Sequence, residues 1–305
     1  MNRHYLISTL YTIVTACYLI ASLPWPWWVI ALTIIPLTSM VIHVPMFALG
    51  LLLGDRNNLV KQSVWMVLLM LIASLWFATQ GGWIQYVAWT ALALLFVWPH
   101  AVILYPTLVP NSQWLGPVIT CFDTSEKELW LTVDDGPTSD TAALLDLLDT
   151  KGARATFFVK GKLADEATLR AIADRGHTIG NHSWSHPSGT FWCLGPRAIA
   201  EQIDRGVASR LFRAPVGMKN PFVHPALVKR GMRLVGWSAR GFDATMSDAE
   251  RVAERIVPRL EPGAIVVMHQ GREWSLRCIE QVIDEAQRRG YRFVIPDERA
   301  LKTKR

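Results

Sequence analysis

The sequence predicts an α/β protein, a distorted (β/α) barrel of about seven strands, preceded by an all-α transmembrane region of about four helices. Two observations support this. Residues 1–105 hold only four of the 56 Asp, Glu, Lys and Arg side chains of the 305-residue chain. Further along, short β-rich apolar runs alternate with charged amphipathic stretches. We therefore expect a transmembrane region at 1–105, a linker at 106–127 and a barrel at 128–300.

Four apolar runs make up the first region, each near the roughly 20 residues that a membrane-spanning helix needs. They are Tyr5–Leu23, Trp27–Leu53, Ser63–Thr79 and Trp83–Leu104. A cleaved signal peptide would explain only the first run. The core of a soluble domain is excluded as an explanation, because four charged side chains are too few for the polar surface that a soluble domain of 105 residues needs.

The basic residues of this region predict its orientation. Arg3 precedes the first run, and Arg56 and Lys61 lie between the second and third, whereas the other two connections carry no charge. The excess of Lys and Arg in cytoplasmic loops favours a multi-pass protein of the cytoplasmic (inner) membrane. After four spans the C-terminal part returns to the cytoplasmic side.

The C-terminal part alternates between expected strands and expected helices. The strands are Leu129–Val133, Thr156–Val159, Thr178–Gly180, Leu211–Arg213, Leu234–Trp237, Ile265–Met268 and Arg292–Ile295. The helices are Ser139–Leu148, Glu166–Asp174, Pro196–Arg205, Pro221–Arg230, Asp248–Leu260 and Leu276–Arg289. This alternation is typical of a parallel α/β fold. None of the helices begins with a glycine-rich phosphate-binding motif.

Reactive side chains follow several of these strands where each strand ends. They are Asp134 and Asp135 after the first, His182 and His186 after the third, Arg213 at the end of the fourth, Asp243 past the fifth and His269 after the sixth. The carboxyl ends of barrel strands meet on one face, where active sites form. We therefore expect these side chains to lie together.

The residue types point to a metal site. His182 and His186 are four residues apart, so both rings can share a face, and two imidazoles with one carboxylate make a three-ligand site with open positions. Asp134 and Asp135 would repel each other without a compensating cation. The same ligand types also form the Fe(II) site of oxygenases, but that interpretation leaves Asp134 and His269 unexplained. A plain turn is the simplest alternative for the Asp-Asp-Gly-Pro segment.

Four segments in this order resemble the motifs of the polysaccharide deacetylases, the NodB-homology carbohydrate esterases of family 4. They are Thr132–Pro137, His182–His186, Arg213–Gly217 and Val267–His269. The resemblance covers roughly residues 128–296. It implies a distorted barrel and metal-dependent removal of an N-acyl group from an amino sugar. Two departures stand out. Val216 stands where the family often has an aromatic residue, and a further family motif, between the third and the last, is matched only loosely by Trp237–Asp243, whose spacing is unusual.

The resemblance also implies a role for each site residue. Asp134 would be the general base, and Arg213 would hold it in place and keep it ionised. His269 would be the general acid, with Asp243 as its partner. The metal ligands would be Asp135, His182 and His186. The metal would be divalent, with zinc expected first and cobalt, nickel or manganese as alternatives.

The position of the predicted barrel next to a membrane region predicts its substrate class. We expect an amino-sugar glycan or a lipid-linked saccharide carrying an acetyl or formyl group. A catalytically inactive, membrane-anchored glycan-binding protein of the same fold is the alternative. Nucleic acid is not an expected partner, because the net charge of +6 forms no basic stripe. The four cysteines contain no CxxC pair that would hold zinc, and the sequence leaves the oligomeric state open.

Overall fold

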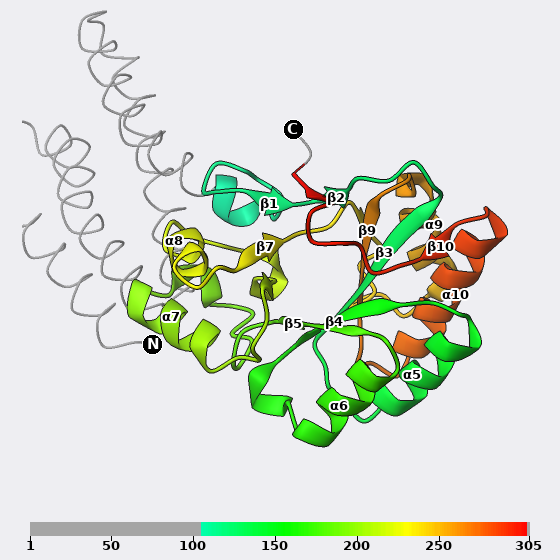
Figure 1. Cartoon of the computed structure of the whole chain (residues 1–305), viewed down its shortest axis with the longest axis horizontal. Helices are drawn as coiled ribbons and strands as arrows, with labels where there is room; N and C mark the ends of the chain where they lie inside the picture. The colour runs from blue at the N-terminus through cyan, green and yellow to red at the C-terminus, as the bar shows by residue number, and fades with distance from the viewer. Residues whose placement is uncertain (1–104, 304–305) are drawn as a thin grey trace, which may run out of the picture. The chain divides into compact units, whose positions relative to one another are not determined.

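The computed structural model describes residues 105–303 (Figure 1). The four apolar runs expected to cross the membrane lie outside this range. Between residues 105 and 303 no helix combines the length and the apolar character that a membrane span requires.

A ring of parallel strands forms the centre of the described unit. All seven strands expected from the sequence are present. They are β3 (Glu128–Asp134), β4 (Ala155–Val159), β5 (Thr178–Asn181), β6 (Leu211–Phe212), β7 (Arg233–Val235), β9 (Ala264–His269) and β10 (Arg292–Phe293). Strands β3, β4, β5, β6 and β7 pair in that order, and β9 pairs with the other edge of β3. All of these pairings are parallel, which confirms the predicted topology.

A broken strand closes the ring. β7 pairs with β6, and a few residues later β8 (Ala239–Arg240) pairs with β9. Between them the Ser238 N–H donates to the carbonyl of Ile265. The segment 233–240 therefore joins the two edges of the sheet, and the ring is a distorted barrel. The break between β7 and β8 contains Trp237, which lines the pocket described below.

Alternation along β3 separates the inside of the barrel from its outer layer. Leu129, Leu131 and Val133 belong to the core between the strands and the helices. Trp130 belongs to the second core, inside the ring, where Thr132 donates to the carbonyl of Val266. Side chains two residues apart on a strand share a face, so Asp134 lies on the inner face with Trp130 and Thr132.

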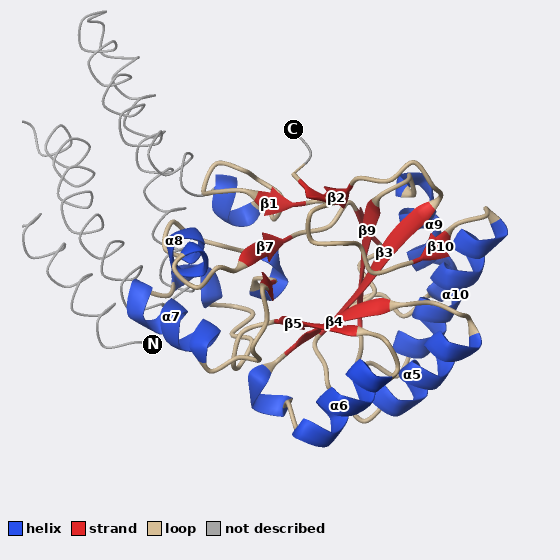
Figure 2. Ribbon diagram, in the orientation of Figure 1, coloured by secondary structure: helices blue, strands red, loops and turns tan. Residues whose placement is uncertain are grey.

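Helices cover the outside of the ring (Figure 2). They are α5 (Thr141–Thr150), α6 (Glu166–Asp174), α7 (Pro196–Asp204), α8 (Val223–Val228), α9 (Ala249–Ile256) and α10 (Ser275–Arg288). Two of them begin at an aspartate cap: Asp165 accepts from the N–H of Thr168, and Asp248 accepts from the N–H of Arg251. Such caps satisfy backbone donors that the first turn leaves unpaired.

Some short strands were not expected from the sequence. The segment 106–127, predicted as a linker, contributes β1 (Val118–Ile119) and β2 (Cys121–Phe122) to the sheet, where β1 pairs with β7 and β2 with β9. After residue 300, β11 (Leu301–Lys302) pairs with β2. These additions extend the sheet beside the barrel.

Candidate active site

The carboxyl ends of the parallel strands meet at one cavity of about 460 Å³. Asp134 ends β3 and His269 ends β9, while His182 follows β5. All three line the cavity, together with Asp135 and His186. The predicted gathering of these residues on one face is therefore what the fold produces. Arg213 and Asp243 lie behind this lining layer and contact it through Asp134 and His269.

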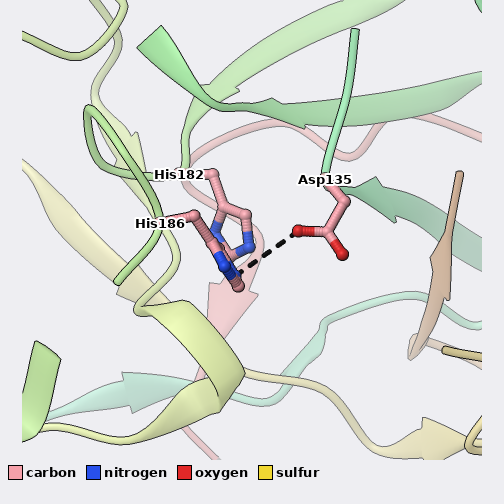
Figure 3. A group of neighbouring side chains, drawn as sticks. All are labelled: Asp135, His182 and His186. Atoms are coloured by element: carbon pink, nitrogen blue, oxygen red, sulfur yellow. Dashed lines mark ion pairs between the residues drawn. The ribbon is translucent and has the colours of Figure 1, made fainter. Parts of the chain in front are cut away.

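Three of these side chains form a group that fits a metal ion (Figure 3). One ligand atom from each of Asp135, His182 and His186 lies within 4.8 Å of the other two. Asp135 Oδ1 is 3.4 Å from His186 Nε2. This is the ligand set predicted from the sequence.

The hydrogen bonding of this group leaves it suited to a cation. His182 Nδ1 lies 2.8 Å from the carbonyl oxygen of Arg213, to which its N–H donates, so Nε2 is available as a ligand. Asp135 Oδ1 is buried yet accepts no hydrogen bond from the described residues. The Lys160 ammonium group lies 3.4 Å from this oxygen without forming a hydrogen bond, and a bound cation would satisfy the oxygen directly.

The protonation states agree with this assignment. Burial, and then the neighbouring His182, lowers the pKa of His186 to about 4. Burial also lowers the pKa of His182. Burial alone would raise the pKa of Asp135, but the nearby imidazoles and the Lys160 ammonium group lower it to about 2. The group therefore offers two neutral imidazoles and one carboxylate at neutral pH, the forms in which these side chains bind metals.

Asp134 is held by a buried arginine. Arg213 Nη1 donates to Asp134 Oδ1 at 2.8 Å and to Thr132 Oγ1 at 2.7 Å, and both charged side chains are almost completely buried. Arg213 Nε and Nη2 donate to the carbonyls of Val235 and Gly236. Held by these bonds, Arg213 fixes the Asp134 carboxylate at the cavity wall.

His269 is held by a buried aspartate. Asp243 Oδ1 lies 3.0 Å from His269 Nδ1, and Asp243 Oδ2 accepts the backbone N–H of His269 at 2.6 Å. Burial opposes the charged imidazole, but the Asp243 carboxylate and its hydrogen bond raise the pKa of His269 to about 8. The structure therefore places Asp243 beside His269, although the spacing of the Trp237–Asp243 motif is unusual.

Backbone strain concentrates at this cavity. Five non-glycine residues of the described range have a positive φ: Asp135, Ser183, His186, Val216 and Phe242. All of them except Ser183 line the cavity, and Ser183 directly follows the ligand His182. Each such residue costs about 1–3 kcal/mol and persists only where the surrounding structure enforces it. Their grouping is typical of a functional site.

The wall around Trp237 depends on the segment before β1. The Asn111 side chain donates to the carbonyl of Trp237 at 2.5 Å and accepts its N–H at 3.3 Å. The buried Lys219 ammonium group donates to the carbonyls of Val109 and Pro110, at 3.1 and 2.8 Å. This segment therefore supports the rear of the active-site wall.

Reasoning from the sequence missed three cationic residues of the cavity: Lys160, Arg240 and Arg272. Lys160 directly follows β4, and its Nζ lies 3.4 Å from Asp135 Oδ1. Arg240 ends β8 and lines the same cavity. Lys160 could have been found, because it directly follows an expected strand just as Asp134 and His182 do. Arg240 could not, because β8 has only two residues and no sequence pattern marks it.

Comparison with known proteins places this geometry in a family. Residues 122–235 match the family model described as polysaccharide deacetylase. A chitooligosaccharide deacetylase of Rhizobium leguminosarum bv. phaseoli is 33% identical over an alignment of 162 residues that covers 48% of this chain and 70% of the relative. The peptidoglycan-N-acetylglucosamine deacetylase PgdA of Listeria monocytogenes is 28% identical over 183 residues, 57% of this chain. The match spans only 39% of the Listeria protein.

Solved structures share the fold. A family 4 carbohydrate esterase from Streptomyces lividans, in complex with acetate, matches with a TM-score of 0.53 and 27% identity, over 58% of this chain and 96% of that one. The peptidoglycan deacetylase PdaC from Bacillus subtilis matches with a TM-score of 0.51 and 27% identity, over 56% and 89%. Residues 122–235, which match the family model, include Asp134 with its partner Arg213 and the group Asp135, His182 and His186, and this chain belongs to the polysaccharide deacetylase family.

Proposed function

We propose that this protein is a metal-dependent hydrolase that removes an N-acyl group, acetyl or formyl, from an amino sugar. One observation carries the proposal. A group suited to a divalent cation lies in the same cavity as a carboxylate fixed by Arg213 and an imidazole paired with Asp243. Amide hydrolysis needs a base for the attacking water and an acid for the departing amine. The deacetylase names of the relatives support the same reaction class.

The protein residues divide the proton transfers between them. A divalent cation held by Asp135, His182 and His186 would act as a Lewis acid towards water and the acyl carbonyl. Asp134 accepts the proton of the attacking water, and Arg213 keeps that carboxylate oriented. His269, charged below a pKa of about 8, delivers a proton to the leaving nitrogen. A backbone N–H of the Val216 turn is our proposed donor to the developing oxyanion.

We also propose that the substrate is a membrane-associated or lipid-linked glycan. The support is the apolar composition of residues 1–105, which predicts a multi-pass region of the cytoplasmic membrane. The charge distribution of that region further favours the cytoplasmic side for residues 105–303. On that side, a lipid-linked amino sugar is within reach and the assembled cell wall is not.

Acetate and formate release tests the reaction class. The purified full chain, supplied with a divalent metal, is incubated with N-acetylated chito-oligosaccharides and an N-formyl amino sugar. We expect release of acetate or formate that stops with a chelator and returns when metal is added. The control is Arg170→Gln, which removes an exposed arginine of α6 that belongs to no motif and does not line the cavity. Glycan binding without release would instead favour an inactive glycan-binding protein.

A further inference from the structure

Arg240 is a partly buried cation of the cavity that has no ion pair among the residues the structure describes. Its guanidinium lies 4.1 Å from the ring centroid of Phe242 and 5.5 Å from that of Trp237. Burial lowers its pKa, and the nearby Asp243 offsets part of that effect. A cation withdrawn from water without a paired anion is costly.

The acidic groups around the cavity are already engaged. Asp134 is paired with Arg213, Asp135 contacts Lys160, and Asp243 is paired with His269. Arg272 also lines the cavity, is exposed and has no ion pair among the described residues. The lining therefore carries positive charge that its own carboxylates do not neutralise. A metal ion on the Asp135 group would add to this excess.

The aromatic rings give Arg240 a defined orientation. Phe242 is 43% exposed and has a positive φ, so its ring is held at the cavity surface rather than packed in the core. A guanidinium stacked on aromatic faces keeps its N–H donors in its own plane free for a ligand. Arginine binds carboxylate and phosphate oxygens with two parallel hydrogen bonds.

We propose that Arg240 is a specificity-determining residue that binds an anionic group, a phosphoryl or a carboxylate, carried by the acylated amino sugar. This inference rests on the proposed function and narrows its substrate class. Phe242 and Trp237 act as positioning residues that hold the guanidinium flat. Neutral amino sugars reach the same catalytic groups, but they leave Arg240 without its partner and bind less well.

The test compares matched neutral and anionic compounds on the full-length chain. The compounds are N-acetylglucosamine, N-acetylglucosamine 1-phosphate, and N-acetylmuramic acid, which carries a carboxylate. For each, calorimetry gives the binding constant, and acetate release gives kcat and KM. The variants are Arg240→Gln, Arg240→Lys and Phe242→Leu. Arg170→Gln is the control, because it removes one exposed positive charge from α6.

The wild-type chain should bind at least one anionic compound more tightly than the neutral one. Arg240→Gln should weaken that binding about 10- to 100-fold, the range of hydrogen bonds to charged groups, and leave the neutral compound within about twofold. Arg240→Lys should bind the anionic compound with an affinity between those of the wild type and Arg240→Gln, because lysine keeps the charge but lacks the planar guanidinium donors. The compound that responds identifies the anion as phosphoryl or carboxylate.

Two failures can be told apart. Equal binding of neutral and anionic compounds by the wild-type chain, or an equal loss for both in Arg240→Gln, overturns the role of Arg240. If no compound or chito-oligosaccharide releases acetate or formate, the proposed reaction is wrong, while the binding constants still decide the role of Arg240. The wild-type comparison needs no variant, so a poorly folded Arg240→Gln does not prevent the test.

Discussion

Two buried pairs of opposite charge hold the groups that we propose as the base and the acid. Asp134 is joined to Arg213 and His269 to Asp243, and each pair holds its cavity-lining member in one orientation. The pairs differ in which charge faces the cavity: a carboxylate in one and an imidazolium in the other. That difference is the basis of the opposite roles that we propose for two groups at the ends of the neighbouring strands β3 and β9.

Replacing Asp134 tests the base. Asp134→Asn keeps the shape of the side chain and removes its basicity. Asp134 Oδ2 lies 3.8 Å from His182 Nε2, but Asp134 is not one of the three proposed metal ligands. We expect kcat to fall about 10²- to 10⁴-fold, the usual effect of losing a general base. Metal content, measured on the same preparation, should stay near one ion per chain. A rate near that of the wild type would mean that another residue is the base.

Replacing a ligand tests the metal site. His182→Ala or Asp135→Ala leaves two donors where three are needed to hold a divalent ion. We expect both metal content and activity to be lost, in contrast to Asp134→Asn, which should lose activity alone. Elemental analysis of the purified variants provides the measurement. Full metal occupancy in either variant would rule out this ligand set.

The pH dependence tests the acid. His269 must be protonated to donate, and its pKa is raised to about 8. As pH rises through 8 the charged fraction falls, so kcat/KM should decline above that pH. Asp243→Asn removes the carboxylate that stabilises the charged ring, and should shift this decline towards the ordinary histidine value of about 6.5. If Asp243→Asn leaves the decline of kcat/KM above pH 8 unchanged, a group other than His269 causes that decline.

At the scale of elements, the strands that alternate with helices along the chain could be predicted. β3 and β9 are long apolar runs, and α10 has a clear 3.6-residue pattern. β6 and β10 have only two residues each, but each lies in a short apolar run within that alternation. β1, β2, β8 and β11 are equally short and lie outside it, so only their distant partners define them. The metal-ligand group was predictable because its residues follow predicted strands. Arg240 was not, because its place depends on how β8 closes the ring.

Gly217 lies where the turn after Arg213 packs against Trp237 and against the segment before β1. It has a φ of +73°, and an added Cβ would lie 2.4 Å from Trp237 Cη2 and 2.7 Å from Pro110 Cβ. Gly217→Ala should therefore lower the free energy of unfolding by about 1–3 kcal/mol, as overpacking does, and reduce kcat/KM by moving Trp237. Denaturant unfolding and steady-state kinetics measure the two effects.

Gly152→Ala is the matched control for Gly217→Ala. Gly152 also has a positive φ, but an added Cβ meets nothing within 4 Å. It should show the backbone cost of an alanine at positive φ without the overlap, and leave kcat/KM unchanged. If the two variants lose equal stability and neither changes activity, the packing at Gly217 does not shape the active-site wall.

At the scale of the whole molecule, the cavity opens from a unit that the sequence attaches to an apolar region of about 105 residues. The side of the membrane on which that unit lies decides which glycans it meets. The cytoplasmic side remains our proposal, based on the positions of Arg3, Arg56 and Lys61. Cys193 and Cys278 are buried, so the native thiols are poor reporters of that side.

An introduced thiol reports the side directly. Ser125 is exposed in the turn between β2 and β3, and Ser125→Cys places a reactive group there. A membrane-impermeant thiol reagent should fail to label this variant in intact spheroplasts and label it after lysis. The unaltered chain, with its own four cysteines, gives the background. Labelling before lysis would place the unit outside and make surface polysaccharide the substrate.

The support behind Trp237 sets a lower limit on how short a working enzyme can be. Every motif lies between residues 132 and 269, so a fragment starting at residue 113 would keep all of them. It would nevertheless lack the Asn111 amide that brackets Trp237 and the carbonyls that hold Lys219. Such a fragment would keep its catalytic residues but lose the hydrogen bonds that support the Trp237 side of the cavity. The smallest autonomous enzyme therefore begins ahead of Val109, in a stretch that no motif marks.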